Sequence, residues 1–173
     1  MDFDAIDHTS DRPLPADFNR RDPHDLAEDL LGRDLVRVLD DGTELRGRIV
    51  ELEVYGHIPD PASHGHSGVP TERTAAMFGV PGTVYVYLIY GMYYCLNVVA
   101  PSAERPSALL IRALDPIHGL SEMAENRGLA SRYEGEMPKK VQKNLLSGPG
   151  KLCQAMQIDT TFNEYPLDAP PLY

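Results

Sequence analysis

The stretch "GTVYVYLIYGMYYCLNVV", residues 82–99, has the composition of two β-strands joined by a tight turn. β-branched and aromatic residues, which favour strands, fill both halves, and Gly91 interrupts them near the middle. The stretch therefore predicts two strands that meet near "YGMY" (90–93). It also holds five of the nine tyrosines of the chain, namely Tyr85, Tyr87, Tyr90, Tyr93 and Tyr94.

These tyrosines allow three interpretations. As core residues, they need only aromatic packing, with the hydroxyl group reaching water. As ring walls, they could enclose a planar ligand, and a ring at the turn could wedge between stacked bases. Asn97 and Arg112, polar residues inside apolar strands, favour a ligand because they would be costly to bury without a partner. Asn97 could instead bond a neighbouring backbone group, and Arg112 could pair with a core carboxylate.

Segments on both sides extend this sheet. "LVRVL" (35–39) and "LRGRIVELEVYG" (45–56) are joined by an Asp-Gly turn and predict a β-hairpin, and "SALLIRALDP" (107–116) predicts a buried strand. The fold class is therefore α+β, a single domain with a mainly antiparallel curved β-sheet and surrounding helices. Helices are predicted within residues 23–32, 72–79, 117–127 and 147–158, a loop within 130–139, and an irregular tail within 160–173.

Composition and charge restrict the class of protein. The 173 residues suit one domain, in which residues 1–19 form a flexible acidic arm and residues 20–173 form the folded part. The formal net charge of −10 is uneven, because residues 1–44 contribute −8 and residues 139–151 hold four lysines and no acid. The net negative charge therefore does not exclude a polyanionic partner such as a nucleic acid. Without a signal-like start or a membrane-length apolar run, we expect a cytoplasmic protein with no membrane partner.

The longest predicted strand places two carboxylates on one face. Its alternation sets Val50, Leu52 and Val54 on one side, and Glu51, Glu53 and Tyr55 on the other. Residues two apart on a strand stand roughly 6.5 Å apart, near the lower end of the carboxylate spacing of inverting glycosidases. A carbohydrate hydrolase is thus one hypothesis, and a solvated outer face with two ordinary glutamates is the other.

Two further segments carry polar groups. The loop "HIPDPASHGHSGVPT" (57–71) offers His57, Asp60, His64 and His66 as a candidate metal set, or simply as an exposed polar loop. "LLSGPGKL" (145–152) could hold a phosphate at Ser147, Gly148 and Lys151, or could be a plain helix start. Cys95 and Cys153 lie in apolar patterns and are predicted to be core thiols.

Five motifs occur in order along the chain: "ELRGRIVELEVY", "DPASHG", "MFGVPGTVYVYLIYGMYYCLNVV", "ALLIRALDP" and "SGPGKLCQAMQI". Together, over residues 21–165, they resemble the alkyladenine (3-methyladenine) DNA glycosylase family of the mammalian type rather than the helix-hairpin-helix type. The resemblance implies a monomeric enzyme that flips alkylated or deaminated purines out of double-stranded DNA and hydrolyses their N-glycosidic bonds, without a metal or organic cofactor.

The resemblance also implies roles for individual residues. Glu53 corresponds to the residue that activates water, and Arg112 to the one that helps to hold that water. Tyr90 corresponds to the residue that fills the gap left in the duplex. Tyr55, His64 and Tyr87 correspond to the walls of the base pocket. Asn97 corresponds to the floor of that pocket, which excludes guanine.

The end of the chain leads to a second expectation. Members of this family typically continue with further strands, so the resemblance predicts a C-terminally truncated domain. The alternative function is therefore a catalytically weak or inactive remnant that at most binds damaged DNA.

Overall fold

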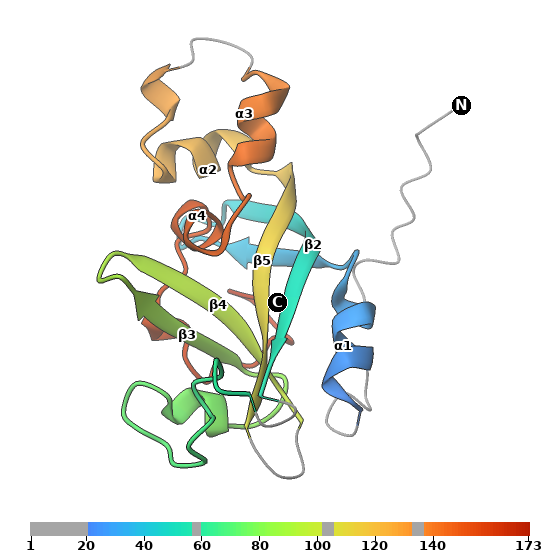
Figure 1. Cartoon of the computed structure of the whole chain (residues 1–173). Helices are drawn as coiled ribbons and strands as arrows, with labels where there is room; N and C mark the ends of the chain where they lie inside the picture. Colours follow the sequence, from blue (N-terminus) through green and yellow to red (C-terminus); the bar gives the residue numbers. More distant parts are fainter. Residues whose placement is uncertain (1–20, 57–59, 102–105, 133–136) are drawn as a thin grey trace.

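An antiparallel sheet of five strands runs through the centre of the molecule, in the order β1-β2-β5-β4-β3 (Figure 1). The structure is a computed structural model and describes residues 21–56, 60–101, 106–132 and 137–173. The acidic arm expected at residues 1–19 lies outside these ranges, as does His57. The predicted α+β class with an antiparallel sheet is confirmed, and the strands are β1 (Asp34–Val38), β2 (Glu44–Tyr55), β3 (Val84–Ile89), β4 (Tyr93–Ala100) and β5 (Ser107–His118).

Two hairpins account for four of the strands, as the sequence predicted. β1 and β2 are joined through Gly42, whose φ of 88° suits glycine. β3 and β4 are joined at Tyr90 and Gly91, with φ of 54° and 68°, and the Met92 amide donates to the Ile89 carbonyl across 3.2 Å. Two consecutive residues with positive φ match the twist of antiparallel strands, and this fixes the register of the hairpin.

The pairing of β2 with β5 contains three irregularities that the sequence did not predict; one lies at Arg46 and Gly47, and two lie close together between Ile49 and Leu52. Ile49 pairs with Leu114, Glu51 with Ala113 and Leu52 with Ile111, so Val50 and Arg112 have no opposite residue. Such bulges reverse the side-chain alternation along a strand.

Because of the bulge, the prediction that Val50 shares a face with Leu52 and Val54 is wrong. Before it, Leu45 and Ile49 point into the core; after it, Leu52 and Val54 do. Val50 itself is 53% exposed, so it does not share their face. The predicted grouping of Leu52 with Val54 on one side and of the two glutamates with Tyr55 on the other remains consistent with the structure.

Within the described ranges, four short helices lie around the sheet. Asp22 caps the first by accepting from the His24 amide (2.8 Å), and Pro23 occupies its first position, as the sequence predicted. The segment predicted to be helical from residue 117 is strand through His118, because Gly119 with φ of 78° separates β5 from the next helix. The third helix was not predicted; it begins at Lys139, the last residue of the predicted loop 130–139. The bounds are α1 Pro23–Leu30, α2 Leu120–Asn126, α3 Lys139–Asn144 and α4 Pro149–Ala155, with 3₁₀ turns η3 Ala75–Phe78, η4 Ala130–Arg132 and η5 Thr160–Phe162.

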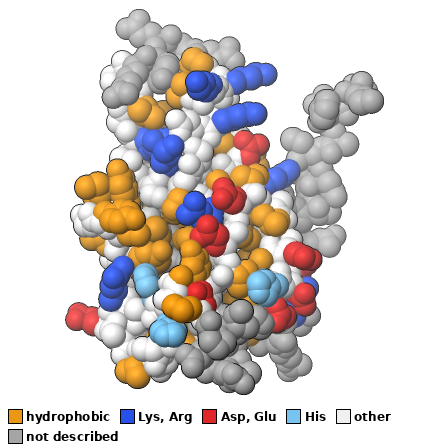
Figure 2. All heavy atoms as spheres, in the orientation of Figure 1, with side chains coloured by type: hydrophobic (Ala, Val, Ile, Leu, Met, Phe, Trp, Pro, Cys, Tyr) orange, Lys and Arg blue, Asp and Glu red, His pale blue; other side chains and the backbone are white. Residues whose placement is uncertain are grey.

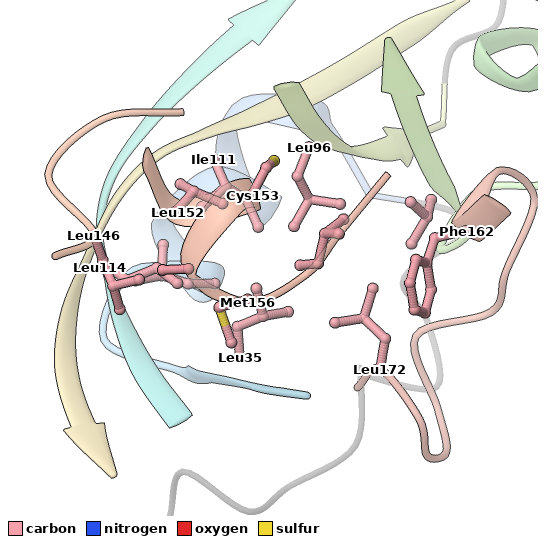
Figure 3. Close-up of a cluster of buried hydrophobic side chains, with 14 of the residues drawn as sticks. Leu35, Leu96, Ile111, Leu114, Leu146, Leu152, Cys153, Met156, Phe162 and Leu172 are labelled. Atoms are coloured by element: carbon pink, nitrogen blue, oxygen red, sulfur yellow. The ribbon is translucent and has the colours of Figure 1, made fainter. Parts of the chain in front are cut away.

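The sheet buries side chains on both faces. A large cluster joins one face to the helices, and Figure 3 shows it with Leu96 and Ile111 of the sheet beside Leu152 of α4. Both predicted core cysteines are buried thiols, which confirms that prediction. A smaller cluster on the other face packs the sheet against η3 and consists of Ala76, Met77, Tyr85, Val99 and Ala108.

The C-terminal tail is irregular, as predicted, but it is bonded to both edges of the sheet. Residues 164–165 exchange hydrogen bonds with Val84 of β3 (2.8 and 2.9 Å), and Tyr173 exchanges two with Val36 of β1 (2.7 and 3.0 Å). Phe162 and Leu172 extend the large cluster and are drawn together in Figure 3. The tail thus covers edge groups that would otherwise be unpaired.

Candidate active site

An acid–base group lies over β2 and β5. The Tyr55 hydroxyl donates to Glu53 Oε2 across 2.7 Å, and Arg112 Nε lies 3.3 Å from Glu53 Oε1. Glu51 Oε1 is farther from the same Nε, at 3.7 Å. Arg112 reaches this face because the bulge in β5 turns it away from the core. The two oxygens of Glu53 are therefore held by different partners.

The contact from Arg112 is an ion pair rather than a hydrogen bond. Its Nε is buried and, among the residues that the structure describes, has no hydrogen-bond partner, although it lies within ion-pair distance of Glu53. The Glu53 side chain is 39% exposed, so water can reach its carboxylate. The hydrogen bond to Glu53, followed by burial, raises the pKa of Tyr55 to about 12. Tyr55 therefore stays a proton donor to Glu53 at neutral pH.

A cavity of about 200 Å³ opens beside this group, on the face of the sheet that η3 covers. The four residues expected to form a base pocket, Tyr55, His64, Tyr87 and Asn97, all line it. Tyr87 and His64 meet edge to face, with ring centroids 4.5 Å apart. The remaining lining residues are Ala62, Met77, Tyr85, Ile89 and Ala108. The structure thus brings together side chains from β2, the 60–71 loop, β3 and β4.

Tyr85 also belongs to this cavity, although it was not among the residues predicted to form the base pocket. Its hydroxyl lies 2.8 Å from His64 Nδ1, and burial raises its pKa to about 12. Burial and the Arg73 cation lower the pKa of His64, so this imidazole is neutral at pH 7. Period-two spacing from Tyr87 was the signal that could have placed Tyr85 on the same face.

Asn97 is a fixed part of the cavity. It is 3% exposed, and its Nδ2 donates to the carbonyls of Tyr85 (3.0 Å) and Cys95 (3.2 Å). This is the backbone bonding that the sequence left open as an alternative. Because both amide hydrogens are engaged, Asn97 has none to donate to a ligand, and it acts on a ligand through its shape and its carbonyl oxygen.

Arg73 is a second residue near the cavity that the sequence analysis did not identify. Its guanidinium carbon lies 5.6 Å from the centroid of the Tyr87 ring, within cation–π range. It also donates to the Leu88 carbonyl across 3.3 Å. Nothing in its surroundings in the sequence distinguishes it from an ordinary exposed arginine.

The turn between β3 and β4 presents apolar side chains to solvent. Tyr90 is 82% exposed and Met92 65%, and Figure 2 shows hydrophobic side chains gathered at this end of the hairpin. A positive φ is uncommon for tyrosine, and here it belongs to the turn that joins β3 to β4.

The start of α4 lies against the same hairpin. A Cβ at Gly150 would approach the Tyr93 side chain to 3.0 Å, so the glycine permits this contact. The three candidate phosphate contacts, Ser147, Gly148 and Lys151, occur here. Lys151 Nζ donates to Ser147 Oγ across 3.2 Å, and both side chains also donate to Asn144 Oδ1. Basic side chains of nearby α3 add positive charge (Figure 2).

The histidine loop does not form a metal site in the described part of the chain. There, no three His, Cys, Asp or Glu side chains converge as ligands. His64 instead faces Tyr85, while His57 lies outside the described residues. None of the described helices has the length and apolar character required to cross a bilayer.

Comparisons with known proteins identify the family of this chain. Residues 17–173 match the family described as methylpurine-DNA glycosylase. A "Putative 3-methyladenine DNA glycosylase" of Clostridium novyi is 43% identical over 160 residues, which are 92% of this chain and 78% of that protein. A protein of the same name from Bacillus cytotoxicus is 45% identical over 159 residues, or 92% of this chain and 76% of its own length.

Proposed function

Because the chain belongs to the methylpurine-DNA glycosylase family, we propose that it is a monofunctional DNA repair hydrolase that removes alkylated or deaminated purines from duplex DNA. The observation that carries this proposal is Glu53, held by Tyr55 and Arg112 beside an aromatic cavity. The sheet-centred fold favours the mammalian type over a helix-hairpin-helix type. We further propose a monomer that works on DNA in the cytoplasm.

Glu53 is the proposed general base. Tyr55 occupies one of its oxygens and Arg112 faces the other, so the carboxylate is oriented while water still has access. Glu53 takes a proton from water as the water oxygen bonds to the sugar C1′. The C1′–N9 bond breaks, and its electron pair leaves with the purine. A purine methylated at N3 or N7 is cationic before this step and leaves neutral, so it requires no acid.

The cavity beside Glu53 is the proposed base pocket. Its volume of about 200 Å³ is below the range of sites for whole drug-sized ligands and suits a single flipped base. Tyr55, His64 and Tyr87 supply ring faces, which attract a cationic base more strongly than a neutral one. Asn97 serves as the rigid floor that would clash with the exocyclic amine of guanine.

The apolar turn and the start of α4 form the proposed DNA face. Tyr90, exposed at the tip, fills the space that the flipped nucleotide leaves. Ser147, Gly148 and Lys151 contact a phosphate of the same strand. The packing of Gly150 on Tyr93 supports a single DNA face, because it holds the start of α4 beside the β3–β4 hairpin.

Base release is the test of this proposal. The protein is incubated with methylated duplex DNA and with a hypoxanthine duplex, and the freed bases are measured by chromatography beside an active relative. We expect release of methylated purines by the native chain and loss of release in Glu53→Gln. No release by the folded native chain would refute the enzymatic proposal, and tight binding to an abasic-site duplex without release would indicate a binding protein.

A further inference from the structure

A second, larger cavity lies on the core side of the sheet, and the proposed glycosylase chemistry does not use it. It has a volume of about 640 Å³ and lies between β1, the start of β4, α4 and the C-terminal tail. Aromatic side chains of Tyr93, Tyr94 and Phe162 line it, together with the polar Gln154. The volume lies in the usual range of small-molecule sites.

A buried arginine faces this cavity. Arg37 of β1 lines it and is 8% exposed, with its guanidinium carbon 4.9 Å from the centroid of Phe162. One terminal nitrogen donates to the Val38 carbonyl, whereas Nε is buried without a hydrogen-bond partner in the described part of the chain. No described carboxylate forms an ion pair with it. A buried guanidinium with so few partners is costly unless something else compensates its charge.

The neighbouring acids compensate Arg37 incompletely. Asp40 and Asp159, which also line the cavity, raise the pKa of Arg37, but burial lowers it by more; the net pKa lies below the usual value of arginine, and the side chain stays cationic. Asp159 is already engaged, because its Oδ1 accepts from the Thr161 amide across 2.8 Å and caps η5. An acceptor group supplied from outside would therefore stabilise the arginine.

We propose that this cavity binds a planar organic anion of about nucleotide size, with its phosphate or carboxylate on Arg37 and its ring against Tyr93 and Tyr94. The guanidinium fork matches two oxygens of such a group. The cavity is larger than an inorganic ion needs, and its aromatic lining suits a flat body. Met92 and Tyr93 line the cavity and lie beside Tyr90, the proposed DNA contact. The anion is therefore either a free nucleotide or a nucleotide of a bound DNA strand.

Calorimetric titration of the native chain with deoxyadenosine monophosphate tests this proposal. We expect one binding site, and weaker binding of both deoxyadenosine and inorganic phosphate. Arg37→Gln should weaken nucleotide binding about tenfold or more, since it removes charged hydrogen bonds. Gln154→Glu, on an exposed residue, should also weaken it by adding a negative charge to the cavity. Ser121→Glu adds the same charge on α2 outside the cavity and is the matched control.

Competition separates the two sources of the anion. Displacement of the nucleotide by lesion-bearing duplex would assign the cavity to a DNA strand, whereas undisturbed binding would assign it to a free nucleotide. The proposal is overturned if the folded native chain does not bind the nucleotide at millimolar concentration. It is also overturned if Gln154→Glu binds as tightly as Ser121→Glu. The titration requires no turnover, so its outcome is independent of base release.

Discussion

Replacing Glu53 by glutamine removes the charge that holds Tyr55 and Arg112, and the consequence can be measured on Tyr55 itself. The pKa of Tyr55 is raised to about 12, chiefly by its 2.7 Å hydrogen bond to Glu53 and secondly by burial. A hydrogen bond to a charged group contributes about 1.5–3 kcal/mol, which corresponds to about one to two pKa units. Because burial persists in Glu53→Gln, the Tyr55 pKa should fall toward 10 without reaching it.

Carbon-13 NMR of labelled tyrosine follows this titration, with Tyr55→Phe used to assign the signal. Base release from methylated duplex is measured on the same samples. Glu51→Gln is the matched control, because the Glu51 carboxylate lies 3.7 Å from Arg112 Nε, whereas the Tyr55 hydroxyl donates to Glu53. We expect Glu53→Gln to lower the Tyr55 pKa and lose activity, and Glu51→Gln to do neither. Equal loss in both variants would refute a single base and favour two catalytic carboxylates.

Three further predictions concern the cavity, the turn and the tail. Arg73→Gln should raise the pKa of His64 toward its ordinary 6.5, because a repelling cation is removed while burial remains; an unchanged NMR titration would contradict this. Tyr90→Gly should preserve the melting temperature, since glycine suits the positive φ, but weaken binding to abasic-site duplex by about 1–3 kcal/mol in a gel-shift assay. Leu172→Ala should cost about 2–5 kcal/mol of unfolding free energy in denaturant titrations, whereas Leu31→Ala, at a 45% exposed site, should cost far less.

Local chemistry made much of the fold predictable from sequence. Asp-Gly and Tyr-Gly turns between strand-forming runs indicated both hairpins, and Asp22 followed by Pro23 indicated the start of α1. The shared side of Glu53 and Tyr55 followed from the period of two along a strand. These features depend on residues close together in the chain, so they needed no knowledge of tertiary contacts.

Features that depend on distant pairing could not be predicted. The core position of Leu172 arises from bonding of the tail to the edge of β1, which no pattern within the tail indicates. The lysine-rich helix α3 buries none of its residues, so it lacks the apolar stripe that identifies a helix. Tyr85 was not predicted to line the pocket, because its partner His64 lies 21 residues away in the loop.

The bulge at Val50 explains how one strand serves both the core and the site. Up to Ile49, the odd-numbered side chains of β2 point inward; uninterrupted alternation would carry Glu51 and Glu53 into the core as well. Burying each carboxylate would cost several kcal/mol. The extra residue turns Leu52 inward instead, and the matching irregularity in β5 turns Arg112 outward to meet Glu53. The energetics of the core therefore require the same irregularity that assembles the acid–base group, so changes to it should affect folding and activity together.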